Sequence, residues 1–144
     1  MTTIAWDGKT LACDSQATCN DVVMSSTTKK IFKNVGPYAA VAGAGSQGQV
    51  VEWISWIKSG KNGDAPETKV TMLCIKPNGR GVVIFTGQSQ EEITLTKNSA
   101  EGSGMDIAIG AMDAGKSAIE AVKIAIKRDI HSGGKVQSYT VRTV

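Results

Sequence analysis

The sequence has few histidines, cysteines and aromatic residues, and each shortage excludes a class of site. His131 is the only histidine, and the three cysteines are Cys13, Cys19 and Cys74. These cysteines lack the paired spacing of zinc ligands. Any catalytic pair that uses an imidazole would have to use His131. We therefore expect no metal and no cofactor.

Strong charge and long apolar runs are also missing. The 144 residues carry 16 basic and 13 acidic side chains, a net charge of +3, and the only basic cluster is Lys29–Lys33. Such a cluster is typical of a solvated strand end, so no nucleic-acid partner is expected. No segment has the pattern of a membrane span or signal peptide. We expect a single cytoplasmic domain over residues 1–144, with reduced thiols and no membrane partner.

The N-terminal half alternates short apolar runs with turn residues. Asp7-Gly8 predicts a tight hairpin between strands 2–6 and 9–13. The runs 19–25 and 37–44 predict two more strands. Further strands are expected at 70–75, 81–86, 92–96 and 136–141.

Helical periodicity appears in three segments. Apolar residues at 50, 53, 54 and 57 predict a helix between Ser46 and Gly60. A second helix is predicted at 105–114. A third begins with the capping box Ser117–Glu120, and its apolar face is predicted to be Ile119, Val122, Ile126 and Ile130. This order of elements predicts an α+β fold with helices packed on antiparallel sheet.

The glycines Gly43, Gly45 and Gly48 lie between an expected strand and the first helix. Their spacing matches a dinucleotide-binding fingerprint, so a dinucleotide-binding protein is one hypothesis. The acidic residue expected about 20 positions later is missing from the end of the next strand, because Glu67 precedes that strand. A glycine turn before a helix also offers backbone N–H groups to an oxyanion.

The chain opens with a threonine directly after Met1. Removal of Met1 would give Thr2 a free α-amine with a reference pKa of about 7.7–8.0, a base beside its own hydroxyl. Asp14 follows an expected strand, and Lys30 precedes another. If both are close to Thr2, the lysine charge can lower the pKa of the hydroxyl.

Six segments resemble, in order, those of proteasome β subunits and of their bacterial homologue, the peptidase partner of a ring ATPase. Arg-Asp-x-x-Ser-Gly-Gly at 128–134 is the most specific match. The other five segments are Thr2-Thr3-Ile4, 12–18, Lys29-Lys30-Ile31, 42–46 and Gly102-Ser103-Gly104.

The resemblance implies a four-layer αββα sandwich of the N-terminal nucleophile (Ntn) hydrolase type. The helical layer is expected to be shortened, because residues 58–68 are too few for the family's second long helix. The implied catalytic set is Thr2, Asp14, Lys30, Gly45, Ser103, Asp129 and Ser132. The implied substrate-binding set is Ala17, Thr28, Gly43, Gln47 and Val51.

The expected function is that of a self-assembling threonine peptidase that becomes active when Met1 is excised. Its substrates would be peptides or unfolded proteins, cleaved inside a homo-oligomeric ring in which Trp56 contacts a neighbouring subunit. No propeptide is visible, so maturation would need only loss of Met1. An ATPase partner is left open. The alternative is a catalytically silent scaffold or binding module on the same fold that retains Met1.

Overall fold

The structure is a computed structural model that describes residues 2–85 and 91–141. Strands and three helices make up a mixed α+β fold, as the sequence predicts. The strands form a four-stranded sheet in the order β10-β1-β2-β11, a five-stranded sheet in the order β5-β6-β7-β8-β9, and the pair β3-β4. Among the described residues, no helix is long and apolar enough to cross a bilayer.

The four-stranded sheet is built around the predicted N-terminal hairpin. Its strands are β1 (Thr3–Trp6), β2 (Thr10–Cys13), β10 (Ser99–Gly102) and β11 (Gln137–Thr140). In the turn, Gly8 has φ +98°, a conformation that glycine adopts without strain. The Asp7 carboxylate accepts hydrogen bonds from the backbone N–H groups of Lys9, Thr10 and Ala118, so it also ties the turn to a helix.

The five-stranded sheet is antiparallel throughout. Its strands are β5 (Ile31–Val35), β6 (Tyr38–Ala44), β7 (Thr71–Ile75), β8 (Gly81–Phe85) and β9 (Glu91–Thr94). A dinucleotide fingerprint requires parallel strands on either side of its helix. Here the strands that flank the glycine turn, β6 and β7, are antiparallel neighbours, so the dinucleotide-binding hypothesis is wrong for this fold.

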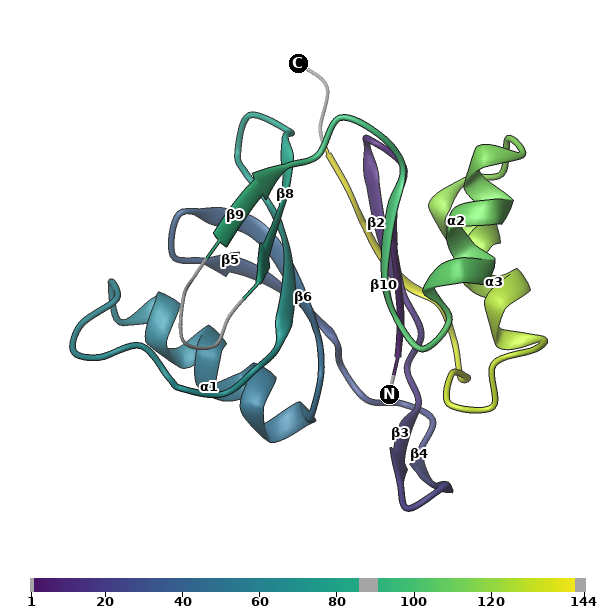
Figure 1. The fold of residues 1–144 in the computed structure, drawn as a ribbon, viewed down its shortest axis with the longest axis horizontal. Coiled ribbons are helices and arrows are strands. Elements are labelled where there is room, and N and C mark those ends of the chain that lie inside the picture. Colours follow the sequence, from purple (N-terminus) through teal and green to yellow (C-terminus); the bar gives the residue numbers. More distant parts are fainter. Residues whose placement is uncertain (1, 86–90, 142–144) are drawn as a thin grey trace.

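Helices lie on the outer side of each sheet (Figure 1). Helix α1 (Gln47–Lys58) packs on the five-stranded sheet, and α2 (Met105–Asp113) and α3 (Ala118–Ile126) pack on the four-stranded sheet. The two sheets face each other across a third apolar cluster. That cluster joins side chains of both sheets: Ile4, Trp6, Leu11, Ala42, Leu73 and Ile75.

Helix α1 alone covers the outer face of its sheet among the described residues, because 59–70 forms no second helix. Its buried stripe is the predicted one, and Ser46 is at the N-cap, although its side chain makes no capping hydrogen bond. Trp56 packs edge-on against Trp53, with ring centroids 5.3 Å apart, and donates its indole N–H to Gly63 O in the following loop. Trp56 is thus partly covered by its own chain.

The predicted boundary of the third helix is wrong. The Ser117–Glu120 capping box is present, but α3 ends at Ile126, and Ile130 is 76% exposed. Beyond the helix, the Asp129 carboxylate accepts the His131 N–H at 3.1 Å in a turn. The buried stripe of α3 consists mainly of alanines, which lets the helix approach the sheet closely.

One strand prediction needs correction, and one strand was not predicted. Residues 19–25 were expected to form one strand, but β3 (Ala17–Cys19) and β4 (Val22–Ser25) form a hairpin that projects from the body (Figure 1). Its turn residues Asn20 and Asp21 both have positive φ, as a tight hairpin turn requires. Strand β10 was not predicted, because its sequence Ser-Ala-Glu-Gly has little strand propensity.

Candidate active site

The N-terminal strand, the end of its hairpin partner and the start of β5 meet at one end of the molecule. Ile4 pairs with Cys13 in the β1–β2 register, so Asp14, the next residue after β2, lies beside Thr2 and Thr3. Lys30 directly precedes β5. Three residues that are far apart in the sequence are therefore brought together by strand pairing and by the packing of the two sheets.

The side chains of Thr2, Asp14 and Lys30 all contact one another at hydrogen-bonding distance. The Thr2 Oγ1 hydroxyl donates to Asp14 Oδ1 at 2.6 Å. Lys30 Nζ donates to Thr2 Oγ1 at 2.9 Å and to Asp14 Oδ1 at 2.9 Å. All three residues are buried, and Asp14 is 0% exposed. A cation and an anion therefore both contact the hydroxyl away from bulk water, where electrostatic interactions are strongest.

The buried Asp14 carboxylate has a full set of donors. Besides Thr2 and Lys30, its Oδ1 accepts the Thr3 N–H at 3.1 Å, and its Oδ2 accepts the Gln16 N–H at 3.2 Å and the Gly133 N–H at 3.0 Å. A buried charge is tolerated when it is paired and hydrogen-bonded. The ion pair with Lys30 and these backbone donors meet that condition, so Asp14 can hold the lysine in place without free water.

Cys13 is the neighbour of Thr2 that the sequence did not indicate. Its Sγ lies 3.5 Å from Thr2 Oγ1. Burial raises the pKa of the Cys13 thiol to about 12, with the Asp14 charge adding to the increase. A thiol with such a pKa stays protonated at neutral pH and is a poor nucleophile, so the hydroxyl is the better candidate.

Gly45 lies between β6 and α1, where its residue type is dictated by geometry. Its φ is +145°, and a Cβ added to it would lie 2.9 Å from Val70 Cγ1. Gly45 and Thr2 line the same two cavities. Within the described part of the chain, the Gly45 N–H makes no hydrogen bond. It can therefore serve as a donor to a ligand atom near Thr2.

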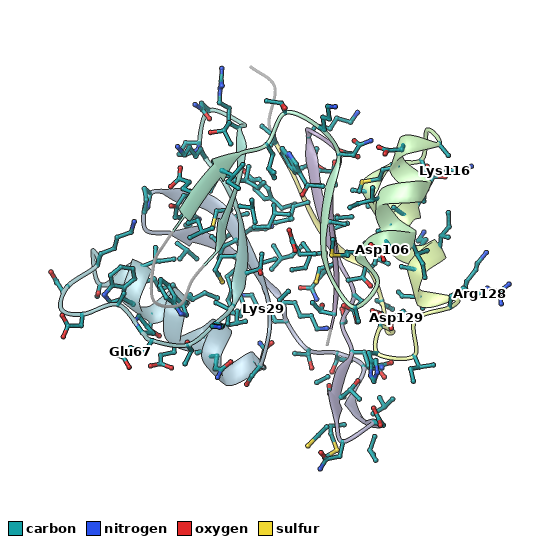
Figure 2. The ribbon with its side chains drawn as sticks, viewed as in Figure 1. Lys29, Glu67, Asp106, Lys116, Arg128 and Asp129 are labelled. Atoms are coloured by element: carbon teal, nitrogen blue, oxygen red, sulfur yellow. The ribbon has the colours of Figure 1, made fainter. Side chains whose placement is uncertain are left out.

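A second polar group links the start of β1 to the turn after α3. The Asp129 Oδ2 atom accepts hydrogen bonds at 2.6 Å from the hydroxyls of both Ser103 and Ser132. Ser132 Oγ also lies 2.7 Å from Thr3 Oγ1, and Ser103 Oγ lies 3.2 Å from Thr2 O. Asp129 itself lies at the base of α3, whereas its neighbour Arg128 points away from the body (Figure 2).

The charge of Asp129 is stabilised by these donors. Burial alone would raise its pKa, but the hydrogen bonds from Ser103, Ser132 and the His131 N–H outweigh burial, so the pKa of Asp129 is lowered. The carboxylate is therefore ionised at neutral pH. It lies one hydroxyl away from the backbone of Thr2, where an ionised acid can orient a positively charged amine.

Two cavities flank Thr2. The smaller has a volume of about 210 Å³ and the larger about 560 Å³. Ala17, Gly43 and Gln47, three of the expected substrate-binding residues, line the smaller cavity. Thr28 and Val51 do not line it: the Thr28 N–H is held by Ser15 O, and Val51 is 44% exposed on α1.

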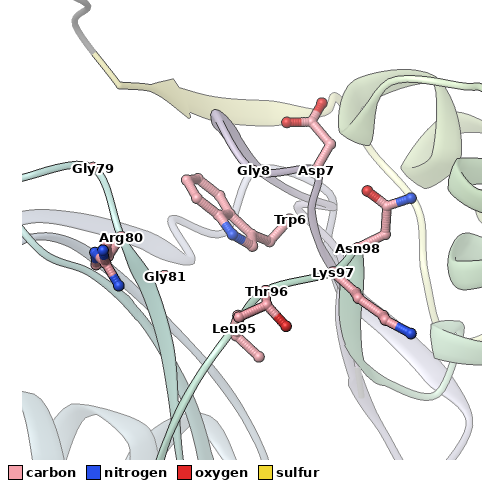
Figure 3. Close-up of a pocket in the computed structure, with 10 residues that line it drawn as sticks. All are labelled: Trp6, Asp7, Gly8, Gly79, Arg80, Gly81, Leu95, Thr96, Lys97 and Asn98. Carbon is pink, nitrogen blue, oxygen red and sulfur yellow. The ribbon is translucent and has the colours of Figure 1, made fainter.

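A third cavity, of about 310 Å³, lies at the opposite end of β1 around Trp6 (Figure 3). None of the expected site residues lines it. Among the described residues, no cluster of histidine, cysteine or acidic side chains could hold a metal ion.

Gln137 is a site residue that sequence analysis missed. Its Oε1 accepts the backbone N–H groups of Lys30 at 2.9 Å and Ile31 at 3.0 Å. Its Nε2 lies 3.0 Å from Asp14 O and 3.0 Å from Thr28 O. Gln137 therefore connects the end of β2 to the start of β5 and sets the spacing of Asp14 and Lys30. A glutamine in a short polar strand carries no sequence signal for such a role.

No protein-family model matches the chain. It is 26% identical over 170 residues to proteasome subunit beta 2 of Pyrococcus abyssi, with 94% of this chain and 82% of the relative covered. It is 25% identical over the same length to proteasome subunit beta 1 of Thermococcus kodakarensis, with 94% and 83% covered. These similarities, at about 25% identity over 94% of the chain, support a short, proteasome β-subunit-like member of the Ntn family.

This proteasome β-like chain is shorter than the aligned region itself. The 170 aligned positions exceed its 144 residues, so the archaeal relatives carry internal residues that it lacks. In residues 2–85 and 91–141, a single helix lies on the outer face of the five-stranded sheet, which is consistent with a shorter chain.

Proposed function

We propose that this chain is an N-terminal threonine hydrolase, a peptidase that uses Thr2 as its nucleophile after Met1 has been removed. The observation that carries the proposal is the buried contact of Thr2 Oγ1 with Lys30 Nζ at 2.9 Å and with Asp14 Oδ1 at 2.6 Å. The relationship to proteasome β subunits supports the same conclusion. Met1 lies outside the described residues, and the small side chain of Thr2 favours its removal.

The fold that accompanies this proposal is a four-layer αββα Ntn-hydrolase sandwich that spans residues 1–144 as one domain. Three apolar clusters support it, since they lie between α1 and its sheet, between the two sheets, and between the second sheet and α2–α3. One outer layer then consists of a single helix.

The proposed reaction starts when Thr2 Oγ attacks a peptide carbonyl carbon and its proton passes to the free Thr2 α-amine. The Lys30 ammonium stabilises the developing alkoxide, because it lies 2.9 Å from the oxygen. The carbonyl oxygen becomes an oxyanion that accepts the Gly45 N–H, a type of interaction that contributes roughly 2.7–4 kcal/mol.

The tetrahedral intermediate collapses when the C–N bond breaks. The protonated α-amine gives its proton to the leaving nitrogen, and the acyl group stays on Thr2 Oγ as an ester. A water molecule then attacks the ester while the α-amine accepts its proton, and the carboxylic acid product leaves with Thr2 restored. Asp129, Ser103 and Ser132 hold the amine in position throughout, as their contacts near Thr2 O and Thr3 Oγ1 suggest.

The substrate is proposed to be a peptide or an unfolded protein, bound with one side chain in the cavity formed by Ala17, Gly43 and Gln47. Thr28 and Val51 do not line this cavity, so they would affect substrate binding only through the residues that do. We also propose that the protein is cytoplasmic and assembles into a homo-oligomeric ring. The exposed apolar side chains of β4, which are Val22, Val23 and Met24, support self-association.

Two measurements on protein purified from cells test the proposal. Intact mass spectrometry is expected to show loss of Met1, and a fluorogenic peptide library is expected to show hydrolysis that Thr2→Ala abolishes. Thr2→Ser is expected to keep part of the activity, because both the hydroxyl and the amine survive. Retained Met1 together with no hydrolysis would instead support the silent-scaffold alternative.

A further inference from the structure

The two cavities at Thr2 share part of their walls and then diverge. Both are lined by Thr2, Gly45 and Ser46. The smaller continues along β3 towards Lys30, whereas the larger extends between the sheets, with Glu101 of β10 on one side and Thr71 of β7 on the other. A peptide cleaved at Thr2 would therefore have one part in each cavity.

The direction of the Glu101 side chain follows from strand alternation. Its neighbour Ala100 is 1% exposed and packs in the cluster formed with α2 and α3. Successive side chains point to opposite faces, so Glu101 points towards the five-stranded sheet. Its register partner Ile4 is fully buried in the cluster between the sheets. Glu101 thus places a carboxylate at the rim of that core.

This carboxylate has no partner in the part of the chain that the structure describes. It makes no hydrogen bond or ion pair there, and it is the only ionisable side chain among the described residues that line the larger cavity. Burial raises the pKa of Glu101. In the smaller cavity, by contrast, the Lys30 charge is balanced by Asp14.

We propose that Glu101 makes the larger cavity a subsite for a cationic group of the substrate, the ammonium of a lysine or the guanidinium of an arginine. An unpaired, half-buried carboxylate is costly in this position, and a bound cation would offset that cost. In this proposal the residue before the scissile bond occupies the smaller cavity, so the subsite receives the residue after it. The inference rests on the proposed function, because it takes Thr2 as the point of cleavage.

The test uses internally quenched peptides that differ only at the residue after the scissile bond, which is lysine, norleucine or glutamate. Wild-type kcat/KM is expected to be about five- to tenfold higher for lysine than for norleucine, where tenfold corresponds to about 1.4 kcal/mol. Glutamate is expected to be the poorest. Glu101→Gln should bring the lysine-to-norleucine ratio close to one, and Glu101→Lys should favour the glutamate peptide.

Glu67→Gln is the matched control, because it removes an exposed carboxylate that lies far from Asp129 (Figure 2) and lines neither cavity. It should leave the lysine-to-norleucine ratio unchanged. The ratio also depends on pH. The wild-type preference is expected to be lost as the pH falls through the pKa of Glu101, which burial raises above its usual value, whereas the Glu101→Gln ratio stays flat.

Equal cleavage of the lysine and norleucine peptides by the wild type, or a preference that survives in Glu101→Gln, would overturn the subsite. If the wild type cleaves no peptide at all, the proposed function fails, and binding decides the subsite separately. Fluorescence anisotropy is then measured with Thr2→Ala and the same peptide sequences, each carrying the fluorophore without the quencher. If Thr2→Ala binds the lysine peptide more tightly than the norleucine peptide, and Thr2→Ala/Glu101→Gln does not, the cationic subsite is supported. If Thr2→Ala binds the two peptides equally, the subsite is refuted. Should Glu101→Gln fail to fold, Glu101→Lys provides the same comparison.

Discussion

Replacement of Lys30 by methionine separates the proposed electrostatic role from a merely structural one. Methionine keeps most of the volume of the side chain and removes only its charge. Breaking one partner out of a buried ion pair costs about 3–5 kcal/mol. The lower end applies here, because Asp14 keeps the Thr2 hydroxyl and the N–H groups of Thr3, Gln16 and Gly133 as donors.

A loss of about 3 kcal/mol corresponds to a fall in Tm of about 6–12 °C for a chain of this size. The protein therefore remains folded at 25 °C if its total stability lies in the usual range of about 5–15 kcal/mol. The rate of hydrolysis by Lys30→Met is expected to fall by more than the loss of folded protein would explain. Removing one donor from a developing oxyanion or alkoxide lowers kcat by about 10²–10³.

Lys29→Met is the control, since Lys29 is exposed and its Nζ lies 5.1 Å from the centre of the Phe32 ring. It should cost at most about 1 kcal/mol and leave peptide hydrolysis unchanged. Lys30→Arg should also be inactive, because a planar guanidinium does not reproduce the geometry of a compact ammonium. The assay is kcat/KM on a fluorogenic peptide at 25 °C, with circular dichroism to verify folding. Equal activity of folded Lys30→Met and Lys29→Met would refute the proposed role of Lys30.

Three further predictions concern the supports of the site. Asp129→Asn should make Tm fall less in acid than it does in the wild type. The pKa of Asp129 in the folded protein lies below its usual 3.8. The ionised carboxylate therefore stabilises the fold above pH 3.8, and this stabilisation disappears as the pH falls through the folded pKa. A Tm drop between about pH 5 and pH 2.5 that matches the wild type would contradict this. Gln137→Leu should lower the free energy of unfolding in urea by about 1–3 kcal/mol, because it leaves buried polar groups unpaired. It should also reduce kcat more than it raises KM, because Gln137 no longer holds Lys30 and Asp14 in place. An unchanged kcat would refute this positioning role. Gly45→Ala should impair both folding and hydrolysis, since its φ of +145° and the contact with Val70 leave no room for a Cβ; full activity would show that the glycine is dispensable.

The elements that the sequence predicted best were those with strong local signals. The Asp7-Gly8 hairpin, the apolar stripe of α1 and the Ser117–Glu120 capping box all depend on contacts between residues close in the chain. The end of α3 was predicted incorrectly because the helical period of the apolar residues continues to Ile130, past the actual end at Ile126. The Asp129 carboxylate binds Ser103, 26 residues earlier, and the helical period gives no sign of this bond.

The residues of the candidate site were likewise predictable from the sequence only in part. The resemblance named Thr2, Asp14 and Lys30, and the sheets bring their side chains within hydrogen-bonding distance. Gln137 and Glu101 could not be found in this way, because their positions depend on strand register and on which face of β10 or β11 is buried. Polar residues in short strands acquire such roles only from the tertiary fold.

The most direct measurement is the location of a covalent adduct formed with a peptide that carries an electrophilic vinyl sulfone. Tandem mass spectrometry of the labelled N-terminal fragment would identify both the modified atom group and the first residue. We expect a single adduct on the Thr2 side chain, in molecules that have lost Met1. An adduct on Cys13 or elsewhere, or labelling of Thr2 in molecules that still carry Met1, would contradict this expectation.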